Sequence, residues 1–221
     1  MRLYFSLSPN YEPVPFAYQH YLVGAFHKWL GKNDSHDRIS LYSLSWLYGG
    51  YAEQEAVQFP RGAEWMISLY DETQVPRLLE GALKQPDVCC GMKVVKITQQ
   101  ETPDFGGFYA FKTGSPVLAK SKNINGRVKH FVYSDAEADD VLTAALRHKM
   151  DRAGLADTHK DVRVRFDRGF AQARTKLITF KGIKNRVSVC PIIVEGTPTA
   201  VQFAWTVGAG HSTGSGFGFL L

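Results

Sequence analysis

Five glycines lie between Gly208 and Gly218, and this glycine segment constrains the fold of the chain more than any other feature. Glycine adopts backbone angles that other residues avoid, and it lets another backbone approach closely. A run of free N–H groups in such a loop can also bind phosphate. An apolar stretch follows at 217–221. The pattern predicts a glycine-rich loop before a terminal strand at 216–221, with a ligand-free glycine hairpin as the alternative.

The spacing of these glycines argues against three common glycine motifs. A dinucleotide-binding fingerprint needs G-x-G-x-x-G before a helix, but Thr213 stands where the third glycine would be. No lysine follows Lys184, so a P-loop does not fit. Residues 210–214 do match the G-x-S-x-G of serine hydrolases, but no Asp, Glu or His follows Ser212 to complete a triad.

The net charge of +5 is unevenly distributed along the chain. Residues 1–112 hold 10 Lys and Arg against 12 Asp and Glu, a net charge of −2, whereas residues 113–221 hold 16 against 9, a net charge of +7. Nine basic residues and two acidic ones lie between Lys160 and Arg186. Such a block typically binds a polyanion, because neutralised phosphates release counterions. A solvated charged hairpin is the alternative.

The sequence Val-Arg-Val-Arg-Phe at 162–166 places its arginines on one face of a strand and its apolar residues on the other. This pattern predicts a basic face backed by a core. We expect that face and the glycine segment to contact the phosphates of a polyanion, through Arg163, Arg165, Arg168, Arg174, Lys176, Lys181, Gly208, Gly210, Gly214 and Gly216. Phe166, Phe170 and Phe180 either stack on bases or belong to the core.

No metal, cofactor or membrane segment is expected. Cys89, Cys90 and Cys190 lack zinc-type spacing and are expected to fill the core. His20 and His27 lie about 10 Å apart on a helix, too far to share one zinc ion without other ligands. No apolar run approaches the roughly 20 residues that cross a bilayer. With an opening segment typical of a strand rather than of a signal peptide, the expected location is the cytoplasm.

Hydrophobic periodicity and turn residues predict two similar units. The first has strands at 3–7, 41–48, 64–70 and 88–99 and helices at 17–30 and 71–84. This βαββαβ order is typical of a ferredoxin-like unit. The second has strands at 108–111, 117–120, 162–170, 176–181, 186–195 and 216–221, a hairpin turn at 125–126 and helices at 134–152 and 197–206. We therefore predict an α+β fold of two tandem ferredoxin-like units, residues 1–106 and 107–221.

Three stretches carry a family resemblance. They read MRLYFSLSP at 1–9, YQHYLVGAFHKWL at 18–30 with LYSLS at 41–45, and VGAGHSTGSGFGF at 207–219. Together with the two predicted units, they resemble the RNA-processing endoribonucleases of CRISPR systems, the sixth Cas family of the repeat-associated RNA-binding superfamily. The stretches frame the chain, and its middle matches this family only in the pattern of elements.

The resemblance implies a metal-independent cut within CRISPR repeat RNA. In this chemistry the RNA 2′-hydroxyl attacks the adjacent phosphate, which leaves a 2′,3′-cyclic phosphate and a 5′-hydroxyl end. The implied partner is the repeat RNA, and subunits of a CRISPR effector complex and a second copy of this chain are further candidates. A non-catalytic subunit that holds guide RNA would show the same fold and the same basic face. A metabolic enzyme with a phosphate loop is a third alternative, but it does not predict the basic block.

The resemblance also places one acid–base residue late in the first helix and another in the loop after it. These positions fall on His27 and His36, while Arg38, Lys28 or Lys32 would stabilise the charged intermediate. Histidine suits proton transfer because its pKa lies closest to neutral pH.

Each histidine also has an ordinary structural interpretation. His27 could be a polar residue on the exposed face of a helix, and His36 could be part of a turn. His20, Gly24 and His27 share one helical stripe, and Gly24 would let a ligand approach closely. His211 either contacts RNA or is exposed without a ligand. His130, His148 and His159 are scattered and receive no role.

Overall fold

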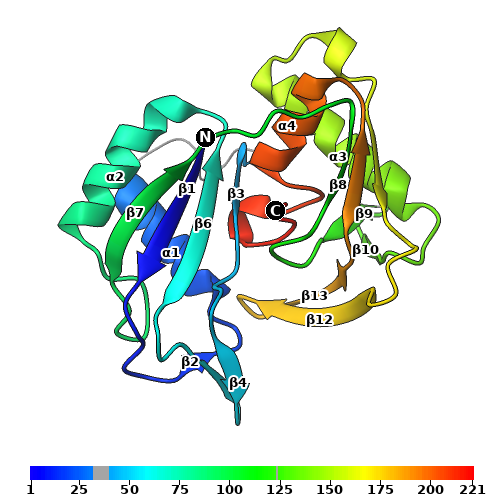
Figure 1. The fold of residues 1–221 in the computed structure, drawn as a ribbon. Helices are drawn as coiled ribbons and strands as arrows, with labels where there is room; N and C mark the ends of the chain where they lie inside the picture. Colours follow the sequence, from blue (N-terminus) through cyan, green and yellow to red (C-terminus); the bar gives the residue numbers. More distant parts are fainter. Residues whose placement is uncertain (32–39, 123) are drawn as a thin grey trace.

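Two α/β units lie side by side in the computed structural model, which describes residues 1–31, 40–122 and 124–221 (Figure 1). The first unit contains β1 (Arg2–Leu7), α1 (Gln19–Leu30), β3 (Tyr42–Leu44), β6 (Ala63–Leu69), α2 (Val75–Lys84) and β7 (Val94–Gln100). Its sheet has the order β3-β6-β1-β7, and all neighbouring strands are antiparallel. This is the ferredoxin-like arrangement that the sequence predicts.

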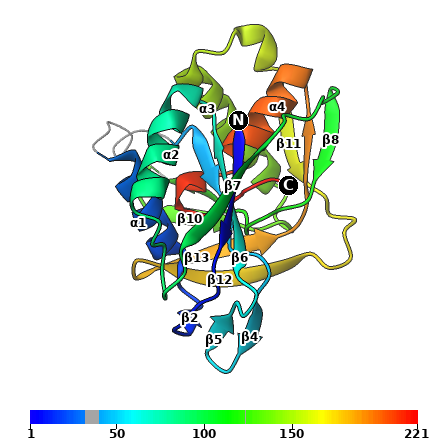
Figure 2. The ribbon, with the colours of Figure 1, turned by 60° about the vertical axis from the view of Figure 1, so that its left-hand side comes forward.

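A small sheet is added to the first unit. It contains β2 (Val14–Pro15), β4 (Tyr51–Glu53) and β5 (Ala56–Gln58) in the order β2-β5-β4. Figure 2 shows it projecting below the main sheet. The sequence analysis did not predict it, because two or three residues per strand are too few to show a periodicity.

The second unit repeats the same plan. Its core elements are β8 (Phe108–Phe111), α3 (Ala138–Ala153), β11 (Arg163–Phe166), β14 (Ile192–Glu195) and α4 (Pro198–Val207). The sheet order is β11-β14-β8. At the position of a fourth strand, Leu220 makes a single antiparallel bridge to Thr113. The predicted terminal strand is therefore reduced to one bridge, because the glycine segment before it follows an irregular path.

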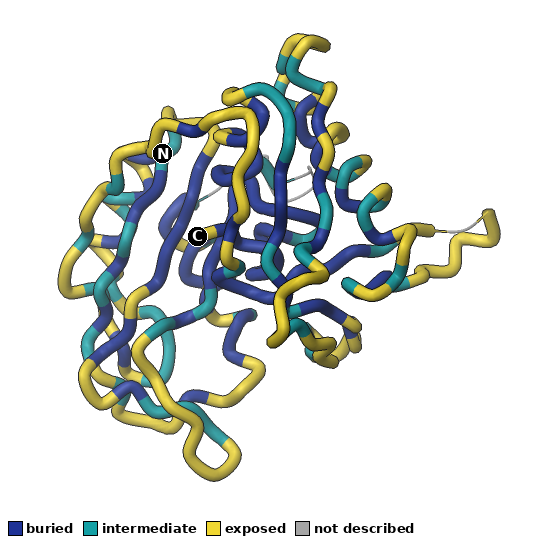
Figure 3. Tube along the Cα trace, turned by 45° about the vertical axis from the view of Figure 1, so that its right-hand side comes forward, coloured by how far each residue is buried: buried dark blue, intermediate teal, exposed yellow. Residues whose placement is uncertain are grey.

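Two hairpins are inserted into this second plan. They are β9 (Ala119–Lys122) with β10 (Val128–Phe131), and β12 (Arg174–Phe180) with β13 (Ile183–Val189). We call β12–β13 the basic hairpin. Single-turn helices at η2 (Glu72–Gln74), η3 (Asp157–His159) and η4 (Thr213–Ser215) complete the described elements. Figure 3 shows the tips of the hairpins exposed and the chain through the centre buried.

Three predicted strands are shorter in the structure than expected, each for a local reason. The predicted strand at 186–195 is broken in two, because Pro191 cannot donate a ladder hydrogen bond. The predicted strand at 162–170 ends at Phe166, since the N–H of Phe170 turns back to the carbonyl of Asp167. The predicted strand at 88–99 begins only at Val94, after a turn in which Gly91 has a φ of 77°.

The two units are joined through Arg2 on β1. Its side chain is 1% exposed and donates to Ser68 Oγ at 2.7 Å, to Trp205 O at 2.9 Å and to Leu220 O at 2.6 Å. The guanidinium also lies over the ring of Trp205, 3.7 Å from its centroid. Since Trp205 and Leu220 belong to the second unit, this first-strand arginine fixes how the two sheets meet.

We predict that Arg2→Met lowers the free energy of unfolding by about 3 kcal/mol, because two buried carbonyls lose a charged donor. Urea denaturation should show the loss, and the exposed Arg61→Met is the matched control, expected to change stability by less than about 0.5 kcal/mol. Equal stability of the two variants would contradict a joining role for Arg2.

Candidate functional site

The glycine segment lies in the core between the two units. Gly208 and Gly210 both have a φ of 74°, and a Cβ at either would stand 2.6 Å from a carbonyl oxygen, that of Gly218 or that of Leu118. Gly214 and Gly216 are buried as well. Packing therefore explains glycine at 208, 210 and 214, and a φ of 83° explains it at 216, while their contact with RNA stays a prediction.

Side chains from both units hold the segment in place. Thr213 Oγ1 donates to the carbonyl of Tyr42 on β3 at 3.0 Å, and Trp46 Nε1 donates to Gly216 O at 2.7 Å. From α3, the buried Lys149 donates to Val207 O, Gly208 O and Thr213 Oγ1 at 2.9 to 3.2 Å. One chain of hydrogen bonds thus runs from α3 through the segment to β3.

The tip of the segment carries consecutive N–H groups without an acceptor among the described residues. Ser212 adopts the left-handed conformation, with a φ of 57°. The backbone N–H groups of Ser212, Thr213 and Gly214 donate to no acceptor within the described part of the chain, whereas those of Ala209 and His211 are bonded to backbone carbonyls. The run of free donors that the sequence predicts is therefore short, and it lies beside α1 and α3.

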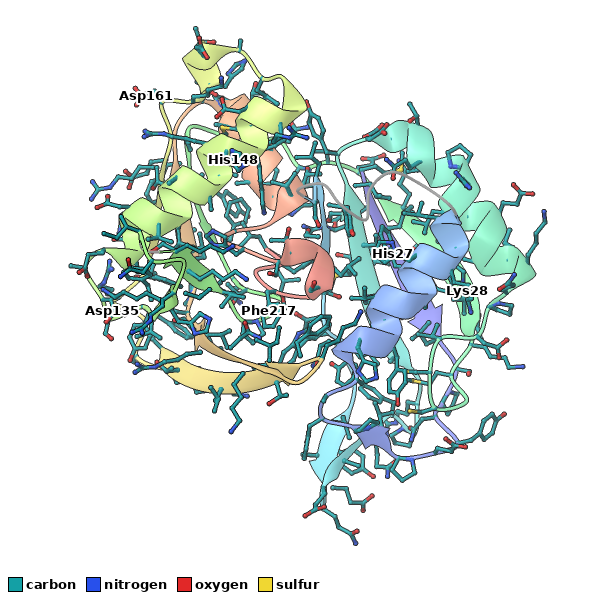
Figure 4. All side chains as sticks on the ribbon, turned by 180° about the vertical axis from the view of Figure 1, so that it is seen from behind. His27, Lys28, Asp135, His148, Asp161 and Phe217 are labelled. Carbon is teal, nitrogen blue, oxygen red and sulfur yellow. The ribbon has the colours of Figure 1, made fainter. Side chains whose placement is uncertain are left out.

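His27 is on the side of α1 that faces the glycine segment (Figure 4). Its neighbours Phe26 and Trp29 point into the core, while His27 itself is half-buried. The centroid of the His27 ring lies 6.4 Å from that of the Tyr42 ring, and Gly214 packs against ring atoms of the same tyrosine. His27 is thus neither buried in hydrocarbon nor turned away from the second unit.

Lys28, another predicted candidate, does not lie beside His27. Lys28 points to the opposite side of α1, where its ammonium group donates to Asp87 O at 2.6 Å (Figure 4). It therefore does not supply the cation near His27. His36, Arg38 and Lys32 lie outside the described residues, so their roles stay predictions.

The strand β11 does present Arg163 and Arg165 on its exposed face, as its alternation predicts. However, Arg165 forms an ion pair with Glu195 on the neighbouring strand at 3.1 Å. Arg168 forms a two-pronged pair with Asp139 of α3, whose shorter contact is 2.6 Å. Carboxylates distant in sequence thus already pair with both arginines, and the contact of these arginines with RNA phosphates stays a prediction.

The basic hairpin keeps its positive charge. Its exposed basic residues are Arg174, Lys176, Lys181, Lys184 and Arg186, and none of them is ion-paired within the residues that the structure describes. Of the three phenylalanines, Phe166 is wholly buried and Phe180 packs near Phe217, while Phe170 is exposed. Phe166 therefore belongs to the core and does not stack on bases.

A group of basic side chains beside the glycine segment was not predicted. It joins His148 and Lys149 of α3 with His211 and with Lys120 of β9. Burial lowers the pKa of Lys149 to about 7. Burial, Lys149 and Lys120 together lower the pKa of His211 to about 4. No sequence pattern could have shown this group, since its members come from three separate segments.

Comparisons with known proteins agree on one family. The family model for the C-terminal part of the CRISPR associated protein Cas6 matches residues 99–221, more than half of the chain. Among solved structures, a Cas6-related protein from Pyrococcus furiosus gives a TM-score of 0.86 at 18% identity, covering 100% of this chain and 97% of that one. A RAMP protein that binds different RNA substrates gives 0.80 at 18% identity, covering 100% and 98%.

A third structure, a Cas6 product complex, gives a TM-score of 0.69 at 14% identity, covering 100% of this chain and 98% of that one. At these identities the likeness establishes the fold. No curated protein sequence matches the chain.

Across the described ranges, no helix combines the length and apolar character needed to traverse a bilayer. In the same ranges, no three His, Cys, Asp or Glu residues are grouped as metal ligands would be.

The lowered pKa of His211 predicts a specific loss of stability in acid. Between the folded pKa of about 4 and the ordinary value of 6.5, the unfolded chain binds more protons than the folded protein. The free energy of unfolding should therefore fall as the pH drops through this window. Urea denaturation at about pH 7, 6 and 5 should show that the free energy of unfolding falls less steeply for His211→Gln than for the wild type. The two slopes should differ by less than about 1.4 kcal/mol per pH unit. Parallel curves for the two proteins would contradict this prediction.

Proposed function

We propose that this chain, which belongs to the family of CRISPR-associated Cas6 proteins, is a metal-independent endoribonuclease that cuts the repeats of CRISPR transcripts into guide RNAs. The observation that carries this proposal is the position of His27. A half-buried imidazole faces the free backbone donors of the glycine segment, at the junction of the two units. A proton-transfer group and groups that bind an anion thus stand close together.

In the proposed reaction, a base removes the proton of an RNA 2′-hydroxyl, whose oxygen then attacks the adjacent phosphorus. The bond to the 5′-oxygen of the next nucleotide breaks, and an acid protonates that leaving oxygen. His27 performs one of these two proton transfers. The second transfer and the cation that stabilises the pentavalent phosphorus are assigned to His36 and Arg38. The products are a 2′,3′-cyclic phosphate and a 5′-hydroxyl end.

The RNA strand is proposed to follow the uncompensated charge of the second unit. The basic hairpin and Arg163 offer exposed cations without carboxylate partners among the described residues. Such contacts position the strand and give binding a strong salt dependence, while base contacts set the sequence preference. Arg165 and Arg168 contribute only if RNA displaces their carboxylates.

The cut is tested with purified protein and the repeat RNA of its own locus, in the presence of EDTA. Wild-type protein should cleave and leave a cyclic phosphate, and a 2′-deoxy substitution at the cut site should stop it. We predict that His27→Ala slows cleavage by about 10²-fold or more, the usual scale for an acid–base group.

His159→Gln is the matched control, because this histidine bonds Thr197 in the second unit and the glutamine can keep that bond. Its cleavage rate should stay close to that of the wild type. Unchanged cleavage by His27→Ala would remove the catalytic role from this residue. Tight binding by the wild type with no cleavage at all would instead identify a non-catalytic subunit that holds guide RNA.

Gly24 provides a second test of the same surface. It lies one helical turn from His27, it is exposed, and a Cβ added there would meet no atom of a described residue within 4 Å. The protein's own packing therefore gives no reason for glycine, which costs a helix about 1 kcal/mol relative to alanine. A ligand that approaches α1 closely at this position would be a reason for glycine there.

We predict that Gly24→Ala raises the free energy of unfolding by about 0.5–1 kcal/mol and yet weakens RNA binding and cleavage. Denaturation and cleavage rates measured on the same preparation separate the two effects. A stabilised variant with undiminished cleavage would show that RNA does not approach α1 here.

A further inference from the structure

A second polar site lies on the other side of the glycine segment from α1. It is a pocket of about 290 Å³ between α3 and the segment, and Figure 4 shows His148 of α3 on the opposite side of η4 from His27. The pocket is smaller than the sites that enclose drug-sized ligands. Its polar lining comes from Ser40, His148, Lys149, His211, Ser212 and Ser215.

Positive charge in the pocket has no acidic partner among the described residues that line it. Lys149 is 4% exposed, and all three of its hydrogen bonds go to neutral oxygen atoms. No described residue that lines the pocket carries a carboxylate. A buried ammonium without a counter-charge is costly, and an anion in the pocket would lower that cost. Lys120 adds a further positive charge nearby, and its own pKa is lowered by burial and by Lys122.

The pocket also contains hydrogen-bonding groups that are not used inside the protein. The Nδ1 atom of His211 is buried without a well-formed hydrogen bond to any described residue, although the carbonyl of Leu118 lies close to the ring. His148 is exposed at the rim, and the N–H groups of Ser212 and Thr213 are free. Positive charge, hydroxyls and imidazoles around a small volume are the groups that bind phosphate oxygens.

We propose that this pocket binds a phosphate group and that, in the RNA complex, it holds one backbone phosphodiester of the strand on the α3 side of the glycine segment. The claim that the pocket binds phosphate is based on the geometry alone, while the claim that it binds an RNA phosphodiester rests on the proposed function. His148 at the rim and His211 inside the pocket contact the phosphate oxygens. Lys149 acts through its charge, since its protons remain bonded to the segment. The site positions the strand, and His27 performs proton transfer on the other side of the segment.

The first test uses inorganic phosphate and does not depend on RNA. Imidazole signals of the full-length protein are followed by ¹H–¹⁵N correlation spectroscopy during a phosphate titration at constant ionic strength, with sodium chloride as the matched salt. The signals of His148 and His211 should shift in a saturable way at millimolar phosphate, and that of His159 should not. The absence of a saturable shift at both pocket histidines would overturn the proposal.

The second test uses repeat RNA and a charge change at the rim. His148→Glu and the control Gln202→Glu each add one carboxylate at an exposed helical position, and Gln202 lies on α4 outside the pocket. Both are made in a His27→Ala background so that the RNA stays intact. Losing one phosphate contact should weaken binding and reduce the slope of log K against log salt by about 0.7, the value for one contact to a single strand. The Gln202→Glu slope should not change.

These outcomes separate the inference from the proposed function. In one outcome, phosphate shifts the histidine signals saturably, but His148→Glu leaves the salt dependence of RNA binding unchanged. The pocket would then bind only small phosphates, and its role in RNA binding would be overturned. Cleavage that depends on His27, with no phosphate shifts, would overturn the pocket and leave the nuclease intact. Phosphate shifts and a reduced RNA slope without any cleavage by the His27-containing protein would support the pocket and refute the nuclease.

Discussion

A single buried guanidinium determines how the two units of this protein meet. Arg2 lies between the rings of Trp205 and Phe219, 3.7 and 4.3 Å from their centroids, and donates to the carbonyls of Trp205 and Leu220. Burial lowers its pKa to about 9, which reflects the cost of removing this charge from water. Ring faces and carbonyl oxygens offset part of that cost, and no carboxylate among the described residues pairs with Arg2. The contact therefore depends on α4 and Leu220 occupying one definite position.

That position leaves room for the backbone but not for a Cβ atom at residues 208 and 210. The carbonyls of Gly218 and Leu118 stand where Cβ atoms at 208 and 210 would be. The glycine segment fits there, and Lys149 on one side and Tyr42 on the other bind it through Thr213. As a result its tip, with free N–H groups, is held between α1 and α3. The same packing that requires glycine thus brings the histidines of two distant helices to opposite sides of one loop.

The order of the elements could be predicted from sequence, because each ferredoxin-like unit is built from local periodicities. Strand β1 alternates between core and surface, and α1 repeats its apolar residues at three and four positions. The points where predicted strands are interrupted were harder to predict, although Pro191 marks one of them. The glycine segment was predicted as a loop but its burial was not, since nothing in these fourteen residues indicates that two units close around them. Burial of that segment depends on contacts with residues 40–46 and 112–118.

The candidate site was less predictable because charge pairing depends on the tertiary fold. Sequence counts treat all nine basic residues between 160 and 186 alike. In the structure, Lys160 contacts Asp151 and Asp157, and Arg165 and Arg168 have partners of their own. An ion-paired arginine attracts a phosphate less than a free one, because binding must first separate the pair. The positive charge of this region is therefore smaller than the composition suggests, and its part without ion pairs among the described residues is Arg163 and the basic hairpin. An RNA strand that follows this charge would pass from the hairpin to the glycine segment, which His27 faces from α1.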